Sequence, residues 1–245
     1  MKDRLDKLMV ERGLALSRER AKALVMEGKV LVDGVPVAKA GLMVPQDSRV
    51  ELKADDIPYV SRGGLKLQGA LDYFNISVTG MTAIDIGAST GGFTDCLLQW
   101  GARRVYCVDV GYGQLAWKLQ QDPRVVILDR TNIRFLKREA VPEEIDLATI
   151  DVSFISLTKV IPCVIGFLRP GAVILALVKP QFEVGRGQVG KGGLVKDEAS
   201  RRKAVEAVSD CAETLGLTVA GVVTSNPPGQ KGNVEYFLCL KKPAI

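Results

Sequence analysis

The stretch Ile84-Asp85-Ile86-Gly87-Ala88-Ser89-Thr90-Gly91-Gly92-Phe93 decides the fold of this chain. It combines an apolar strand with an acidic residue near its end, a glycine-rich turn, and the start of a helix at Phe93. Glycines let the backbone turn tightly and approach a ligand closely. The turn is not the dinucleotide-binding fingerprint G-x-G-x-x-G, because Ser89 stands where that fingerprint requires its middle glycine.

The acidic residue of this stretch, Asp85, indicates the kind of ligand that the turn would hold. Glycine-rich turns at helix N-termini commonly bind a pyrophosphate, which a neighbouring carboxylate would repel. A carboxylate attracts a cation instead, and S-adenosylmethionine carries an α-ammonium group at that end. The sequence therefore predicts an S-adenosylmethionine site, the alternative being an ordinary strand-to-helix turn. The candidate contacts in this stretch are Asp85, Gly87, Ser89, Gly91, Gly92 and Phe93.

The length of the chain and the distribution of its charge suggest more than one domain. The chain has 245 residues, of which 47% are hydrophobic, and a net charge of +5. This length suits one large domain, or a small domain followed by a medium one. Residues 1–53 hold 11 Lys/Arg against 8 Asp/Glu, and the other residues hold 22 against 20. The basic excess is denser at the N-terminus, where a nucleic-acid contact is expected first; a solvated charged surface is the alternative.

Missing residue types exclude several kinds of chemistry. The chain has no histidine, and its five cysteines lack metal-ligand spacing, so we expect reduced, buried thiols and no metal site. No signal peptide is visible at the charged N-terminus. The longest apolar run, Ala172 to Val178, suits a buried strand and is too short to cross a bilayer. These features predict a cytoplasmic protein without a membrane partner.

Residues 1–53 have the pattern of a small α+β domain. An apolar stripe from Leu5 to Met9 predicts one helix, and Ser17 can cap a second. Asp33-Gly34 between apolar runs predicts a hairpin, and residues 49–52 could return as a further strand. Arg18 and Lys22 lie one turn apart on the second predicted helix, away from its apolar face. The candidate RNA contacts are Arg4, Arg18, Lys22 and Lys29.

The pattern changes after residues 54–62, which are polar, broken by a proline, and read as a linker. From residue 63 to 245, strands and helices alternate, which predicts a parallel sheet with helices on both faces. We expect strands at 82–86, 104–110, 124–128, 146–150 and 172–178. We expect helices at 65–74, 93–100, 113–121, 157–168 and 197–215, followed by an antiparallel strand pair at 217–223 and 236–240. This is an α/β, Rossmann-like methyltransferase sheet, parallel with a terminal antiparallel strand.

Polar residues end the predicted strands, at the edge of the sheet where ligands bind in open α/β folds. Asp109 ends the second strand, where an acid can accept both hydroxyls of a ribose, and Asn132 follows the third, where an adenine would lie. Asp151 ends the fourth strand and Lys179 ends the fifth. A lysine that closes an apolar strand is a candidate general base, although a surface lysine that extends to solvent is the alternative.

Two more residues, Lys66 and Glu235, gain meaning from a resemblance. The second domain resembles the FtsJ-type ribose 2′-O-methyltransferases, which use a Lys-Asp-Lys-Glu tetrad in this order. The matching motifs are Gly63-Gly64-Leu65-Lys66-Leu67, Asp151-Val-Ser-Phe, Val-Lys179-Pro-Gln-Phe-Glu and Gly-Asn-Val-Glu235-Tyr-Phe. The resemblance implies that Lys66, Asp151, Lys179 and Glu235 are catalytic. By their positions at strand ends, Asp109, Asn132 and Asp151 are also candidate contacts for the cofactor.

The first domain resembles the S4-type RNA-binding domain of ribosomal and rRNA-modifying proteins. The two domains in this order resemble the TlyA family, some of whose members carry a hemolysin label. The resemblance covers nearly the whole chain and implies 2′-O-methylation of cytidine in ribosomal RNA, with S-adenosylmethionine as cofactor and ribosomal RNA or ribosomal subunits as partner. The linker segment Ile57-Pro58-Tyr59-Val60 does not repeat the arginine-bearing linker of some relatives.

Three other functions remain as alternatives. A non-catalytic RNA-binding protein could use the same fold as a scaffold, although the intact tetrad argues against it. A membrane-active hemolysin would need a membrane-spanning segment or a strongly amphipathic basic helix, and the sequence shows neither. A base methyltransferase commonly carries an Asn/Asp-Pro-Pro-Tyr/Phe turn after the fourth strand, where Asp151-Val-Ser-Phe stands here.

Overall fold

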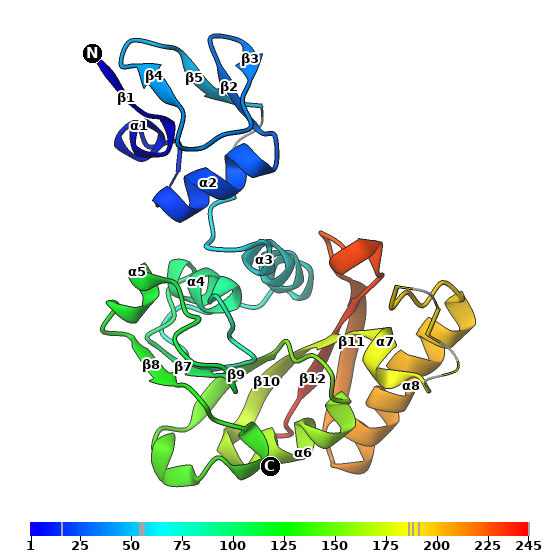
Figure 1. Ribbon diagram of the computed structural model, residues 1–245. Coiled ribbons are helices and arrows are strands. Elements are labelled where there is room, and N and C mark those ends of the chain that lie inside the picture. The colour runs from blue at the N-terminus through cyan, green and yellow to red at the C-terminus, as the bar shows by residue number, and fades with distance from the viewer. Residues whose placement is uncertain (16, 54–56, 186, 188, 191, 245) are drawn as a thin grey trace. The chain divides into compact units, whose positions relative to one another are not determined.

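The chain divides into two units, Met1–Pro58 and Tyr59–Ile245, in the computed structural model shown in Figure 1. The structure describes residues 1–15, 17–53, 57–185, 187, 189–190 and 192–244. Each unit has its own hydrophobic core. Among the described residues, no helix is both long and apolar enough to span a lipid bilayer.

The first unit packs two helices against two small sheets. Their buried apolar side chains, which include Leu5, Met9, Leu24 and Val30, form one core. The helices are α1 (Leu5–Glu11) and α2 (Arg18–Met26), and the strands are β1 (Lys2–Arg4), β2 (Val30–Val32), β3 (Val35–Pro36), β4 (Met43–Pro45) and β5 (Val50–Leu52). One sheet has the order β3-β2-β5, and β1 pairs with β4 in the other.

Local chemistry explains the ends of these elements. Ser17 caps α2, because its hydroxyl accepts a hydrogen bond from Arg20 N at 3.1 Å. Asp33 and Gly34 both have positive φ, as a two-residue hairpin turn between right-twisted strands requires, and they join β2 to β3 as predicted. The β1–β4 pair was not predicted, because strands of three residues are too short to show an alternating pattern.

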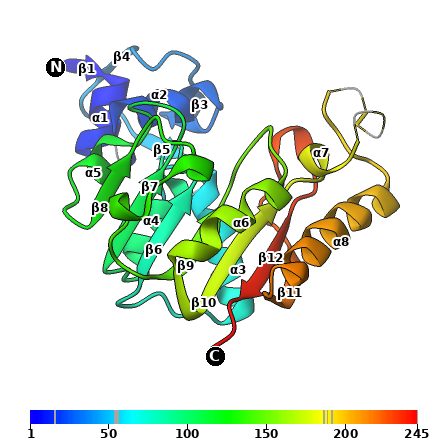
Figure 2. The same cartoon turned by 90° about the horizontal axis from the view of Figure 1, so that it is seen from below.

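The second unit is built on a seven-stranded sheet with the order β11-β12-β10-β9-β6-β7-β8, which Figure 2 shows strand by strand. The strands are β6 (Thr82–Ile86), β7 (Arg104–Val108), β8 (Val125–Leu128), β9 (Ile145–Ile150), β10 (Leu168–Val178), β11 (Thr218–Thr224) and β12 (Tyr236–Lys241). β6 to β10 run parallel, which confirms the predicted Rossmann-like sheet. The antiparallel strand β12 lies between β10 and β11 rather than at an edge.

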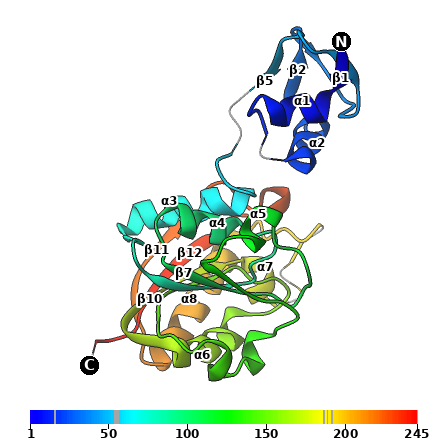
Figure 3. The same ribbon diagram turned by 90° about the vertical axis from the view of Figure 1, so that its left-hand side faces the viewer.

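Helices cover both faces of this sheet, with α3, α4 and α5 on one side and α6 and α8 on the other (Figure 3). The helices are α3 (Arg62–Phe74), α4 (Gly92–Gln99), α5 (Trp117–Gln120), α6 (Ile161–Val164), α7 (Pro180–Glu183) and α8 (Glu198–Thr214). The short 3-10 turns are η1 (Ile133–Phe135), η2 (Arg138–Ala140), η3 (Leu157–Lys159), η4 (Ile165–Phe167) and η6 (Gln230–Gly232). The central strands β6, β7, β9, β10 and β12 are largely buried on both faces, which explains their continuous apolar runs, whereas the edge strands β8 and β11 are partly exposed.

Two predicted helices were wrong in extent. The predicted helix 113–121 contains only α5, because its first residue, Gly113, has a φ of 62° that a helix does not allow. The predicted helix 157–168 is broken into η3, α6 and η4. Pro162 within it lacks the backbone N–H that a continuous helix needs.

Tyr59 and Val60, predicted as part of a linker over residues 54–62, pack into the second unit. The Tyr59 side chain is 4% exposed, and its hydroxyl donates to Gln68 Oε1 at 3.1 Å. Val60 N donates to Asp95 Oδ2 at 2.8 Å. Residues 54–56 of that segment lie outside the described residues. The predicted domain boundaries therefore stay a prediction, while the structure divides the chain after Pro58.

Gly64 offers a test of how Tyr59 packs. A Cβ at Gly64 would overlap the Tyr59 side chain, whereas a Cβ at Gly69 in the same helix would meet only Asn226 O at 3.8 Å. We expect Gly64→Ala to lower the free energy of unfolding by about 1–3 kcal/mol, because overpacking forces the ring to move. We expect Gly69→Ala to raise it by roughly 0.5–1 kcal/mol through helix propensity. Chemical denaturation of both variants followed by circular dichroism would measure the difference, and equal effects would contradict this packing.

Candidate active site

The glycine-rich turn after β6 lies directly against the end of β9. Gly87 has a φ of 84°, and a Cβ at this position would overlap the backbone carbonyl of Asp151. A glycine is therefore required for the turn to approach this strand end. β6 pairs with β7 on one side and with β9 on the other, so the turn sits where the strand order reverses. Ligands bind at this switch point in open α/β sheets.

Asp109 follows β7 and is held by the backbone of two turns. Ser89 N donates to its Oδ2 at 2.7 Å, and Gly111 N donates to its Oδ1 at 2.7 Å. Each carboxylate oxygen retains a further lone pair for another donor. The side chain borders a cavity of about 890 Å³ at the carboxyl edge of the sheet. This position suits the acceptor of ribose hydroxyls that the sequence predicts.

The same cavity contains the predicted Asn132 and is walled by Ile133. The Asn132 side chain accepts from Arg134 N at 3.1 Å and thereby caps η1. Asn132 lines a cavity of a size that accepts a nucleoside. The structure thus brings Asp109 and Asn132 together with Asp151 around one cavity.

Asp85 lies beneath the turn, and it is not among the residues that line the two cavities at this edge of the sheet. Its side chain is fully buried and accepts from Thr94 Oγ1 at 2.7 Å and from Thr149 Oγ1 at 3.0 Å. Burial raises the pKa of Asp85 to about 6, and the two hydroxyl hydrogen bonds oppose this shift. These bonds fasten β6 to α4 and to β9, so the carboxylate supports the turn from below.

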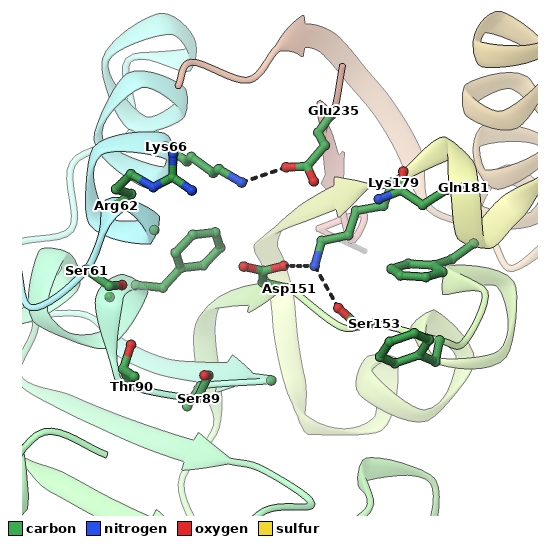
Figure 4. Close-up of a pocket in the computed structure, with 17 residues that line it drawn as sticks. Ser61, Arg62, Lys66, Ser89, Thr90, Asp151, Ser153, Lys179, Gln181 and Glu235 are labelled. Carbon is green, nitrogen blue, oxygen red and sulfur yellow. Dashed lines mark hydrogen bonds and ion pairs between the residues drawn. The ribbon is translucent and has the colours of Figure 1, made fainter. Parts of the chain in front are cut away.

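A second cavity, of about 370 Å³, adjoins the first and holds the predicted tetrad (Figure 4). Lys66 Nζ lies 2.6 Å from Glu235 Oε2, and both side chains are largely buried. Lys179 Nζ lies 2.5 Å from Asp151 Oδ1. The first pair spans α3 and the segment before β12, and the second spans the ends of β10 and β9. Two buried ion pairs from four distant parts of the chain therefore face one cavity.

The two cavities share a wall. Gly87, Ser89 and Asp151 border both, together with Ser153, Phe154 and Phe182. Ser153 Oγ accepts a hydrogen bond from Lys179 Nζ at 3.2 Å. A group held in the larger cavity can therefore meet a second group in the smaller one next to Asp151. Of the other predicted cofactor residues, Gly92 and Phe93 border the smaller cavity, whereas Gly91 is not among the residues that line the two cavities.

Phe154 was missed in the sequence although it belongs to the Asp151-Val-Ser-Phe motif. Its side chain is 91% exposed, its φ is 65°, and its ring centroid lies 5.0 Å from that of Phe182. A positive φ in a bulky residue is a rare, strained conformation that often marks a functional site. Gln181 was also missed: its Oε1 is buried beside the smaller cavity without a hydrogen-bond partner among the described residues. Only the backbone angle and the burial reveal these two residues.

The predicted RNA contacts lie in the first unit and are partly neutralised. Arg4 Nε and Nη2 donate to the two oxygens of Asp6 at 2.9 Å, and Arg18 Nη2 donates to Asp6 Oδ2 at 3.0 Å. Hydrogen bonding from Arg4, and further from Arg18, holds the pKa of the buried Asp6 carboxyl well below its usual range. Lys29 pairs with Glu27 at 2.7 Å, and Lys22 is exposed.

The fold and the site together define a methyltransferase. Residues 59–242 match the family of FtsJ-like methyltransferases, and residues 3–50 match the S4 domain. The chain is 50% identical over 239 residues to the 16S/23S rRNA (cytidine-2′-O)-methyltransferase TlyA of Mycobacterium tuberculosis, covering 97% of this chain and 89% of that protein. The chain belongs to the TlyA family, in which an S4 domain precedes an FtsJ-like methyltransferase domain.

Solved structures agree with this assignment. A protein from Streptococcus thermophilus that carries a hemolysin label is 44% identical, with a TM-score of 0.78 over 99% of this chain and 89% of that chain. The N-methyltransferase NodS of Bradyrhizobium japonicum, solved with S-adenosyl-L-homocysteine, is 17% identical, with a TM-score of 0.53 over 78% of this chain and 91% of that chain. The second likeness shows the fold alone.

The buried Asp85 leads to a prediction about pH. Its pKa is raised in the folded protein from an ordinary 3.8 to about 6, so the native state holds its proton to higher pH than the unfolded chain does. The contribution of this group to stability is therefore full below about pH 4 and declines as the pH rises to about 6. We expect Asp85→Asn to remove this decline, worth on the order of 3 kcal/mol at full size. Denaturation of both proteins between pH 4 and 7 would measure it, and parallel stability curves would contradict it.

Gly229 leads to a prediction about Glu235. A Cβ at Gly229 would overlap the Glu235 carboxylate, whereas a Cβ at Gly166 would meet no atom of the described chain within 4 Å. We expect Gly229→Ala to displace Glu235 from Lys66 and to lower the rate of methyl transfer by about tenfold or more. Gly166→Ala is the matched control and should retain the rate. An unchanged rate in Gly229→Ala would show that the Lys66–Glu235 pair does not need this geometry.

Proposed function

We propose that this protein transfers a methyl group from S-adenosylmethionine to the 2′-hydroxyl of cytidine in ribosomal RNA, in the cytoplasm. The observation that carries the proposal is the convergence of Lys66, Asp151, Lys179 and Glu235 on one cavity beside the glycine-rich turn. The name of the Mycobacterium tuberculosis relative states cytidine 2′-O-methylation of 16S and 23S rRNA for that protein. The substrate, the cofactor and the roles of individual residues are our proposals for this chain.

The larger cavity fits S-adenosylmethionine by its chemistry. Asp109 would accept the ribose hydroxyls, and Asn132 with Ile133 would border the adenine. Asp85, with its charge buried beneath the turn, is proposed to favour the α-ammonium group through its field rather than through a hydrogen bond. When bound, S-adenosylmethionine supplies an electrophilic methyl group. The shared wall at Asp151 would place that group next to the tetrad.

Lys179 is the proposed general base. A 2′-hydroxyl is a weak nucleophile until it loses its proton, and a positioned base accelerates such a step by about 10²–10⁴-fold. Lys179 Nζ is held by Asp151 Oδ1 and Ser153 Oγ, and its side chain is 12% exposed. In its neutral form Nζ can accept the hydroxyl proton, and Asp151 then stabilises the resulting ammonium ion. The proton thus moves from the ribose oxygen to Lys179 Nζ.

Lys66 and Glu235 are proposed to orient the ribose. Their ion pair is largely excluded from solvent, so each group keeps a fixed direction toward the cavity. Lys66 can donate to the hydroxyl oxygen as negative charge develops on it, and Glu235 fixes Lys66. Holding the hydroxyl in line with the methyl group would account for most of the acceleration.

An RNA substrate is supported by exposed side chains in each of the two units. The exposed ring of Phe154 can stack on an unpaired base, as aromatic side chains do in proteins that bind single-stranded RNA. The S4 domain supplies Arg4, Arg18 and Lys22 as proposed phosphate contacts. A 2′-hydroxyl exists in RNA and not in DNA, so the proposed reaction itself selects the class of nucleic acid.

Ribose and base methylation are distinguished by the residues after β9. Here Asp151, Ser153 and Phe154 occupy the position of the Asn/Asp-Pro-Pro-Tyr/Phe turn that holds exocyclic amines. Asn226-Pro227-Pro228 follows β11, a different strand. A non-catalytic binding role is disfavoured by the two buried ion pairs, which cost desolvation and have no evident value for stability alone.

A lysine series tests the proposed base. We expect Lys179→Ala and Lys179→Arg to lower the rate of ribose methylation by about 10²-fold or more, since neither side chain can accept the proton at neutral pH. Calorimetric affinity for S-adenosylmethionine should change by less than about threefold, because the proposed cofactor contacts lie in the other cavity. Ribose methylation of ribosomal RNA would be mapped at nucleotide resolution in cells with and without the gene.

Lys203→Ala, in the exposed face of α8, is the control and should be fully active. If Lys179→Arg retains more than a tenth of the wild-type rate, Lys179 is a charge contact and not the base. If the methylation map is identical in both kinds of cell, ribosomal RNA is not the substrate.

A further inference from the structure

The two loops that carry Asp151 and Lys179 start side by side. β9 and β10 are parallel neighbours, and their pairing reaches Ile150 beside Ala176. Asp151 N still bonds to Ile86 O at 2.9 Å, as a continuation of the sheet. Beyond these points both loops leave the sheet. Their outer ends need contacts of their own if Asp151 and Lys179 are to remain 2.5 Å apart.

Glu183, the last residue of α7, supplies such contacts. Its Oε1 accepts from Leu157 N at 2.9 Å, and its Oε2 accepts from Ser156 Oγ at 2.6 Å. Leu157 is the first residue of η3, so this carboxylate satisfies an N–H group that the 3-10 turn leaves without an internal acceptor. Ser156 Oγ in turn accepts from Thr158 N at 3.2 Å. One side chain therefore binds both the start of η3 and its capping residue.

The hydrogen bonds that Glu183 accepts from Ser156 and Leu157, here called the clamp, complete a closed path of contacts around Lys179, the proposed general base. Phe182 N bonds to Lys179 O at 2.9 Å, which ties Lys179 to the short helix that ends at Glu183. This path of contacts runs from Lys179 through α7 to Glu183, crosses to Ser156, and returns along residues 151–156 to Asp151. Between its two sides, the aromatic rings of Phe182 and Phe154 pack together with their centroids 5.0 Å apart.

We propose that Glu183 is a positioning residue of the methyl-transfer site, which holds the loop of Asp151 in register with Lys179 through its hydrogen bonds to Ser156 and Leu157. It borders neither cavity, so it acts through the residues that it orients. The inference rests on the proposed function, because it assigns to Glu183 an effect on the same reaction. It also explains how Phe154 keeps its positive φ, because its loop is held at one end by the ion pair of Asp151 and at the other by the hydrogen bond of Ser156.

The test compares Glu183→Ala with Glu183→Gln in the full chain. Alanine removes both acceptors, and we expect kcat to fall by about 10–100-fold, since small displacements of catalytic groups have effects of this size. Glutamine keeps an acceptor for Leu157 N and can donate to Ser156 Oγ, and we expect it to restore kcat to within about threefold of wild type. The affinity for S-adenosylmethionine should stay within about threefold in both variants.

Ser156→Ala provides a coupling test. Added to Glu183→Ala it should lower kcat by less than about twofold, whereas added to wild type it should lower kcat more, because residues in one network are not additive. Glu198→Ala is the matched control, since Glu198 is an exposed glutamate of α8 that pairs with Arg202, and it should leave kcat unchanged. The proposal would be overturned if Glu183→Ala and Glu183→Gln lowered kcat equally. It would also be overturned if kcat of Glu183→Ala stayed within twofold of wild type.

Amide hydrogen exchange separates this proposal from the proposed function. Glu183→Ala should speed exchange at Leu157 N–H, which loses its acceptor, and Glu183→Gln should leave it slow. If wild-type protein methylates no ribosomal RNA but Leu157 responds in this way, the clamp exists and the proposed substrate is wrong. If Lys179→Ala is inactive while Glu183→Ala exchanges and turns over like wild type, the proposed function stands and the clamp is refuted.

Discussion

The site depends on one constraint: parallel strands β6, β9 and β10 end at the same edge of the sheet. This brings the glycine-rich turn, Asp151 and Lys179 together, although they are separated along the chain by whole helices. The Lys179–Asp151 pair is largely removed from water and therefore needs a fixed geometry, because two desolvated charges attract each other favourably only when they are well oriented. Ser153 contacts Lys179 directly, and we propose that Glu183 maintains the same geometry through Ser156 and Leu157.

Buried polar groups beneath the glycine-rich turn hold that turn at the edge where the parallel strands end. Asp85, Thr94 and Thr149 come from β6, α4 and β9, and their hydrogen bonds join the three elements beneath the turn. A carboxylate there raises the cost of burial, as its pKa shows. It also fixes the turn more specifically than apolar packing would, since hydrogen bonds have direction and a carboxylate must satisfy both oxygens.

Much of this could be predicted from the sequence, and the failures have physical reasons. Alternating apolar runs predict the parallel sheet, since strands buried on both faces leave a clear pattern. Asp151 and Lys179 could be chosen because each ends a predicted strand, whereas Lys66 and Glu235 could be chosen only through the resemblance to the FtsJ-type tetrad. The sequence could not show that Asp85 lies beneath the turn and outside both cavities, because whether a strand residue points toward the ligand or into the core depends on packing. Phe154 and Gln181 depend on backbone angle and burial, which no periodicity reports. The helix 157–168 was overestimated because apolar spacing persisted across Pro162.

The position of β12 has a consequence for the order in which the protein is made. β12 is antiparallel and lies between β10 and β11, and Tyr236 at its start pairs with Val178 at the end of β10. Glu235 is thus delivered to the active site by the last described strand to leave the ribosome. Until then the nascent chain has the first six strands of this sheet along the sequence, but β10 and β11 each present an open edge, and Lys66 has no Glu235. Completion of the sheet and completion of the tetrad therefore depend on the same segment of the chain, and a nascent chain from which β12 has not yet emerged cannot form the full site.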